Sequence, residues 1–161
     1  MITYNSKRNY IMDEITKQGY SLMSINGEWI SSNDEAVQLI IDSFDELVPA
    51  KTEAKARIVE QSQSYMQQIE SEYPSFERAT WPTQKAEIEV WGIDNTSLTP
   101  LLDNIAIARG MDRVALLDRT LTKVQAYNTQ AAHLAGTRQK LEDVIDTSND
   151  LAFISSINFE A

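Results

Sequence analysis

The sequence predicts a mainly α-helical protein with a small α+β unit at its N-terminus. Helix-start signals recur between Trp81 and Asp112, and no proline follows Asp112. One helix of roughly 35 residues can therefore form over about 112–146. The N-terminal unit is indicated by Asn26-Gly27, the strongest short signal of a β-hairpin. We expect a small α+β unit at 1–48, a helical connector at 49–80 and a helical domain at 81–161.

The N-terminal unit is predicted to begin with a short helix followed by a hairpin. Ile11, Met12 and Ile15 have the spacing of one helix face, which predicts the helix. Gly19 should interrupt it. The segment 20–30 alternates in the manner of strands on either side of Asn26-Gly27. Leu22 and Trp29 are the expected residues of the buried face of this hairpin.

Two further helices are predicted before residue 74. Ser32 followed by Glu35 forms a capping box for a helix from about 33 to 44, which should end before Pro49. From 51 to 73 the apolar stripe is narrow. Such a stripe is typical of a partly exposed connecting helix or of one seam of an oligomeric coiled coil. Tyr73-Pro74 closes this helix.

The segment 81–112 contains the boundaries of three helices. Pro82 and Pro100 take first helical positions, where the amide that proline lacks would have no partner. Thr99 and Asp112 are expected to accept hydrogen bonds from the free amides that follow them. Two glycines are predicted to stop the first two of these helices, Gly92 and Gly110.

The long final helix has an apolar seam at heptad spacing over its first part, made by Val114, Leu117, Leu121 and Val124. The next heptad positions are Asn128, Ala131, Ala135 and Arg138. The seam therefore drifts, which is closer to the period of a bundle helix than to a strict two-stranded coiled coil. Gly136 costs ~1 kcal/mol relative to alanine and is where a break is most expected. The apolar run 151–159 also permits a β-strand and is interpreted as a docking tail.

Composition excludes several classes of partner. The chain has 161 residues and a formal charge of −10, from 24 acidic and 14 basic residues. Nucleic acids and anionic membranes bind basic patches, so neither is an expected partner. Apolar runs such as Leu39-Ile40-Ile41 are far shorter than the ~20 residues that span a bilayer. Cysteine is absent, which suits a reducing cytoplasm.

Catalytic and metal chemistry find little support in the sequence. His133 is the only histidine, and without cysteine a zinc site would need carboxylates to complete it. The carboxylates do not have the spacing of a calcium loop, the serines lack a G-x-S-x-G elbow, and the glycines form no phosphate-binding pattern. We expect no enzyme, no metal and no cofactor, with His133 at a surface or interface.

The aromatic residues and the seam indicate protein contacts. Trp81 and Trp91 either anchor their helix on the long helix or lie at a protein interface, where tryptophan is enriched. The long helix carries more apolar stripe than two short helices can cover, so we expect a homo-oligomer or a complex with another protein. The candidate partner-binding residues are Trp81, Trp91, Val114, Leu117, Leu121 and Val124.

Two groups of motifs carry a resemblance to a known class of proteins. The first group resembles the opening of small tail proteins of tailed bacteriophages: Asn5-Ser6-Lys7-Arg8-Asn9-Tyr10, Gly19-Tyr20-Ser21-Leu22, Ile25-Asn26-Gly27-Glu28-Trp29 and the segment 32–45. The second group resembles the later part of such proteins, several of which are described as tail-fibre assembly proteins. It comprises Trp81-Pro82-Thr83-Gln84-Lys85-Ala86-Glu87, Asn95-Thr96, Thr99-Pro100-Leu101-Leu102-Asp103, Ala108-Arg109-Gly110-Met111-Asp112 and Gly136-Thr137-Arg138-Gln139.

The resemblance implies a non-catalytic role in assembly of the phage tail. We expect a chaperone-like protein that binds tail-fibre subunits in the host cytoplasm, and the resemblance to proteins that serve trimeric fibres implies a trimer. The alternative is a permanent structural component of the virion tail, fibre or baseplate. A third hypothesis is an accessory to a cell-wall hydrolase with a hidden carboxylate site.

Overall fold

The computed structural model describes residues 10–160, and the chain divides into two compact units. The first unit takes in the chain up to Ile58 together with Leu141–Asn158, and the second contains Val59–Lys140 and the residues from Phe159 onward. Neither unit is continuous in sequence, because two long helices each contribute residues to both. These are α3, Leu47–Ser71, and α7, Arg113–Thr147. The units therefore differ from the three consecutive segments expected from the sequence.

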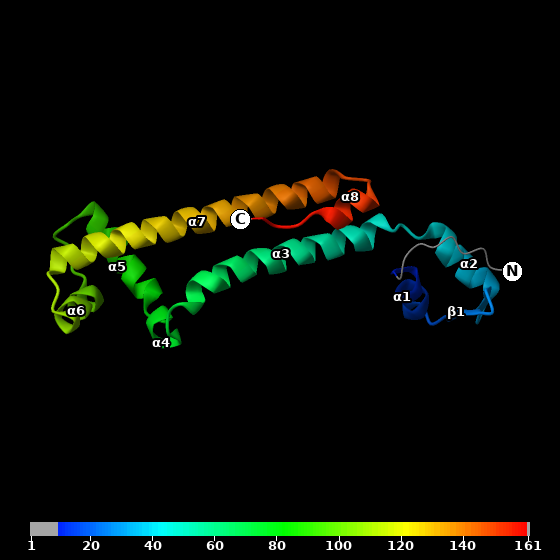
Figure 1. Ribbon diagram of the computed structural model, residues 1–161, viewed down its shortest axis with the longest axis horizontal. Coiled ribbons are helices and arrows are strands. Elements are labelled where there is room, and N and C mark those ends of the chain that lie inside the picture. Colours follow the sequence, from blue (N-terminus) through cyan, green and yellow to red (C-terminus); the bar gives the residue numbers. More distant parts are fainter. Residues whose placement is uncertain (1–9, 161) are drawn as a thin grey trace. The chain divides into compact units, whose positions relative to one another are not determined.

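The first unit begins with the predicted helix and hairpin (Figure 1). Helix α1, Tyr10–Lys17, is followed by the antiparallel strands β1, Leu22–Ile25, and β2, Glu28–Ser31. Asn26 and Gly27 both have positive φ, 53° and 85°. This is the backbone conformation that a type I′ turn requires, and it explains why Asn-Gly stands here. The predicted hairpin is confirmed.

One apolar cluster holds this part of the first unit together. Its buried members come from α1, β1 and α2, Asp34–Ser43: Ile11, Ile15, Leu22, Val37, Ile40 and Ile41. Trp29 packs against the cluster and is half-buried. Side chains on a strand alternate between faces, so Leu22 and Trp29 face the helices while Met23, Ile25 and Ile30 are about half exposed.

The start of α2 lies one residue later than the capping box predicts. Asn33 is the cap, since its side-chain oxygen accepts from the amide of Ala36 at 3.1 Å. The hydroxyl of Ser32 is engaged elsewhere, accepting from the amide of Ser21 across the hairpin at 3.0 Å. The predicted Ser32 cap is wrong because the hairpin, which folds back on this residue, occupies its hydroxyl.

The first unit also contains the C-terminal residues of α7 and helix α8, Leu151–Ser156. The Asp150 carboxylate caps α8 by accepting from the amides of Ala152 and Phe153 at 2.8 and 3.1 Å. Ile154 and Ile157 are buried. The predicted tail is thus partly helical rather than a strand, and it docks on its own chain. The cap favours a turn of helix over the extended conformation that its apolar residues permit.

Besides the second part of α3, the second unit contains three helices before α7: α4, Ser75–Arg78, α5, Trp81–Ile93, and α6, Pro100–Arg109. Gly110 has φ 61° and ends α6, as predicted. Gly92 is the last residue but one of α5, which ends at Ile93, one residue beyond the predicted stop. A β-carbon on Gly92 would lie 3.5 Å from Cδ1 of Leu121. This is an ordinary van der Waals distance, so an alanine would fit at this position against Leu121.

Helix α7 is one continuous helix of 35 residues. The Asp112 side chain accepts from the amide of Ala115 at 2.9 Å and caps its start, as predicted. Gly136 lies within it and does not break it. The described chain is 74% helical. The predicted fold class, a mainly α protein with an N-terminal α+β unit and one long helix, is confirmed.

Candidate partner-binding surface

The second unit is built around a small buried cluster where α5, α6 and the start of α7 meet (Figure 1). Its buried members are Ile88, Trp91, Leu102 and Leu117, and three partly buried residues pack against them, Ile105, Leu121 and Val124. Four of the six residues predicted to bind a partner are therefore in this cluster or against it. Trp91 and Leu117 are 8% and 0% exposed, so the chain's own helices cover them.

Trp81, another predicted partner-binding residue, lies in an aromatic group at the start of α5. Its ring centroid is 5.2 Å from that of Tyr73 and 6.2 Å from that of Tyr127, both in edge-on arrangements. Such arrangements are the favoured ones for aromatic pairs. The side chain is half-buried by contacts within its own chain. Trp81 thus joins the start of α5 to the middle of α7.

The start of α6 is held by a side chain from α5. Both carboxylate oxygens of Glu87 accept hydrogen bonds, from the amides of Leu101 and Leu102, each at 3.0 Å. Thr99 was predicted to cap this helix, but its side chain does not accept from an α6 amide. Its hydroxyl instead donates to the Asp103 carboxylate at 2.7 Å. A negative carboxylate is the stronger partner for amides at a helix N-terminus.

Arg113 connects the start of α7 to the same region. Its Nε donates to the Asp103 carboxylate at 2.7 Å, and its Nη2 donates to the Thr99 hydroxyl at 2.9 Å and to the Ser97 carbonyl at 3.3 Å. The Thr99 hydroxyl, and then the Arg113 guanidinium, hold the pKa of Asp103 below its ordinary value of 3.8. This network fixes the α5–α6 loop, α6 and α7 against one another.

The lowered pKa of Asp103 predicts a pH dependence of stability. A carboxyl whose pKa is lower in the folded state stabilises the fold above its unfolded pKa, and this contribution is lost as the pH falls through the folded pKa. Acidification from about pH 6 to about pH 2.5 should therefore destabilise the wild type more than Asp103→Asn. Urea unfolding followed by tryptophan fluorescence measures the difference. Asp118→Asn, an exposed change on α7, is the control, and equal acid sensitivity of wild type and Asp103→Asn would contradict the assignment.

Five large apolar side chains stand exposed on the segments that surround the buried cluster. We call them the exposed apolar end: Val90, Ile93, Leu98, Ile107 and Val114, which are 54, 92, 86, 78 and 51% exposed. They come from α5, the α5–α6 loop, α6 and the start of α7. Single exposed apolar residues are ordinary on protein surfaces, whereas a contiguous apolar patch is typical of an interaction site.

Only Val114 of the predicted partner-binding residues belongs to the exposed apolar end. The three most exposed residues of this surface were not predicted from the sequence to bind a partner: Ile93, Leu98 and Ile107. The exposure of Ile107 follows from helical periodicity. Leu102 and Ala106 lie on the buried face of α6, and Ile107 lies on the opposite face of the same helix. Ile93 and Leu98 flank the Asp94-Asn95-Thr96 turn, where periodicity gives no direction.

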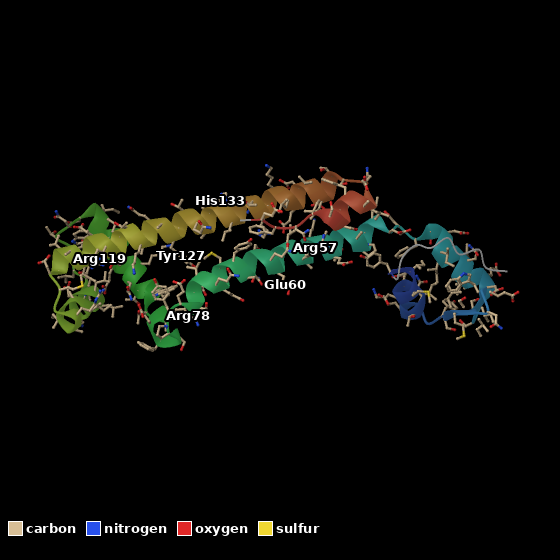
Figure 2. All side chains as sticks on the ribbon, viewed as in Figure 1. Arg57, Glu60, Arg78, Arg119, Tyr127 and His133 are labelled. Carbon is tan, nitrogen blue, oxygen red and sulfur yellow. The ribbon has the colours of Figure 1, made fainter. Side chains whose placement is uncertain are left out.

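Among residues 10–160, no group of three or more His, Asp or Glu side chains could hold a metal ion. His133 is exposed on α7 (Figure 2). A hollow of about 310 Å³ lies between the second half of α3 and the middle of α7, lined by residues that include Ser62, Met66, Leu134 and Arg138. Glu70 also lines it, and the Ser62 hydroxyl donates to the carbonyl of Val59 at 2.8 Å.

Comparisons with protein-family models, with curated proteins and with solved structures found no match to this chain. Within the described residues, no helix combines the length and apolar character needed to cross a membrane.

Proposed function

We propose that this chain is a non-catalytic bacteriophage tail protein that binds tail-fibre subunits and assists their assembly in the host cytoplasm. The sequence resemblance to phage tail proteins supports the biological setting. The exposed apolar end supports the binding role, and it is the single observation that carries the proposal. A permanent place in the virion tail is the alternative.

Burial of the exposed apolar end would supply part of the free energy of specific binding. Fully burying an aliphatic side chain of this size contributes roughly 1.5 to 3 kcal/mol. Five such residues contribute about 8 to 15 kcal/mol in total, which is of the same size as the cost of association, about 4 to 15 kcal/mol, so further contacts with the partner must add to the affinity. The scaffold under them is held by the Glu87 and Arg113 hydrogen bonds, so little further ordering is needed on binding.

A fibre subunit, or further copies of this chain, would remove these side chains from water. A homo-oligomer is part of the proposal, and the resemblance to proteins that serve trimeric fibres makes it a trimer. Light scattering of the purified chain, alone and with fibre subunits of its own phage, separates self-association from complex formation. A chain that stays monomeric and binds no tail protein of that phage would contradict the proposal.

Changing Leu98 and Ile107 together to serine should weaken the complex with the fibre subunit by at least roughly 100-fold. The two side chains are largely exposed, so the fold loses little, while binding loses about 3 kcal/mol or more of apolar burial. Titration calorimetry gives the affinity. The matched control changes Ile30 and Leu39, exposed residues of the first unit, to serine. Equal affinities of the two double variants would locate the contact elsewhere.

Two further measurements separate this role from the competing ones. Mass spectrometry of purified virions should find a structural component at stoichiometric levels and a dissociating chaperone absent. Turnover of peptidoglycan or of receptor polysaccharide, lost when His133 or an acidic pair is neutralised, would overturn the non-catalytic part of the proposal.

A further inference from the structure

The negative charge of this chain is concentrated in its N-terminal part. We call residues 10–48 the head. It holds eight carboxylates, at Asp13, Glu14, Glu28, Asp34, Glu35, Asp42, Asp45 and Glu46, and a single basic residue, Lys17, so its formal charge is −7. Lys7 and Arg8 precede it, so residues 1–48 together carry −5 of the chain's −10. A surface of this sign attracts basic partners and repels acidic ones.

A groove opens between α1, α2 and the first turns of α3, all within the first unit. Its volume is about 680 Å³, within the range of ligand-binding clefts. The apolar part of its lining includes Ile40, Phe44 and Val48. Val48 is 62% exposed, although it is a large aliphatic residue in the first turn of a helix. We call this hollow the head groove.

Four carboxylates line the head groove together with its apolar residues: Asp13, Glu14, Asp45 and Glu53. Within residues 10–160, the ion pairs lie elsewhere, at Lys55–Asp146, Arg78–Glu70, Lys85–Glu89 and Arg113–Asp103. Lys17 is the one basic residue in the lining. The head groove thus combines apolar surface with an excess of negative charge that no described cation pairs with.

Local hydrogen bonds hold the walls of the groove in place. The Tyr10 hydroxyl donates to Glu53 and joins α1 to α3. Asp45 accepts from the amide of Leu47 at 2.9 Å at the start of α3, and Gln18 donates to Glu14 at 2.9 Å. Each of these carboxylates still has acceptor capacity, because an ionised carboxylate offers about four acceptor sites.

We propose that the head groove binds a basic amphipathic segment of a partner protein. Apolar side chains of that segment pack on Phe44 and Val48, while its lysines or arginines pair with the carboxylates around them. This is the helix-in-groove mode of peptide recognition, with charge setting orientation and specificity. Nucleic acids and anionic lipids are repelled by the same charges, and a second copy of this chain brings an equally acidic head. The inference is independent of the exposed apolar end.

The test uses the full chain and a designed helical peptide of about four turns. The peptide carries leucines at positions i, i+3, i+4 and i+7, lysines elsewhere, and a fluorescent label for anisotropy. One control peptide replaces each lysine by glutamate, and a second has the same composition in an order without an apolar face. The groove variant is Asp13→Asn with Glu14→Gln. The charge-matched control is Glu28→Gln with Glu35→Gln, which lie in the head outside the groove.

We expect saturable binding of the basic amphipathic peptide and none of either control peptide. Affinity should fall roughly tenfold in the groove variant at low salt and less than about twofold in its charge-matched control. Val48→Ser should weaken binding several-fold, because it removes apolar contact from an exposed position that the fold does not need. Thermal unfolding checks that every variant is folded.

Three outcomes would overturn the proposal. One is the absence of saturable binding. Another is equal weakening in the groove variant and in its charge-matched control, which would indicate attraction to the head as a whole. The third is stronger binding by a synthetic peptide of residues 1–9, which contains Lys7 and Arg8, because it would assign the head groove to the chain's own N-terminal segment.

Discussion

Leu117→Ala should lower the free energy of unfolding by about 2 to 5 kcal/mol. Leu117 is fully buried in the cluster where α5, α6 and α7 meet, against Ile88, Trp91 and Leu102. The substitution removes apolar contacts and leaves a cavity that surrounding helices only partly close. Urea unfolding followed by far-ultraviolet circular dichroism measures the loss.

Val114→Ala is the matched control for Leu117→Ala. It removes an aliphatic side chain from the same helix, less than one turn away, but this side chain is 51% exposed. Its effect on stability should stay within about 0.5 kcal/mol, as for most surface changes. A loss for Leu117→Ala no larger than that of the control would show that this face of α7 is not the core of the second unit.

Because Leu117 is buried, substitutions in the apolar seam of α7 do not separate partner binding from folding. Aspartate at Leu117 and Leu121 would place charges in and against the cluster of the second unit, so lost assembly would reflect lost folding. Leu98 and Ile107 are better probes because they are exposed. Three of the four seam residues, Leu117, Leu121 and Val124, pack inside the chain, and Val114 is exposed.

Arg57→Ala should destabilise the first unit by about 1.5 to 3 kcal/mol, the range for hydrogen bonds to charged groups. Arg57 lies on α3 next to the C-terminal segment (Figure 2). Its guanidinium donates to the carbonyls of Ile154, Ser155 and Ile157 at 3.2, 3.1 and 2.9 Å. These carbonyls lie at the C-terminal end of α8, where a positively charged side chain is favourable. Chemical denaturation measures the loss of stability.

Lys55→Ala is the control for Arg57→Ala, because both residues lie on α3 and contact the C-terminal part of the first unit, Leu141–Asn158. Lys55 pairs with Asp146 at 2.6 Å, with side chains 35 and 54% exposed. Such exposed pairs contribute about 0 to 1 kcal/mol. Arg57→Lys should restore only part of the stability, since an ammonium group lacks the planar fork that reaches three carbonyls. Equal effects of Lys55→Ala and Arg57→Ala would contradict this account.

Local signals in the sequence determined most of the elements. Asn26-Gly27 specifies its hairpin because the two residues accept positive φ, and Gly110 ends α6 for the same reason. Asp112 caps α7 through its own side chain. The absence of proline after Asp112 permits α7 to continue for 35 residues. Each of these features depends on a few neighbouring residues, so each is readable without knowledge of the fold.

Features that depend on distant residues were decided only by the tertiary structure. The amides at the start of α6 pair with Glu87 rather than Thr99, and Arg57 binds carbonyls about 100 residues along the chain. The exposed apolar end depends on packing in the same way. Periodicity shows which apolar residues share one face of a helix. The packing of α5, α6 and α7 decides which of those residues a neighbouring helix covers.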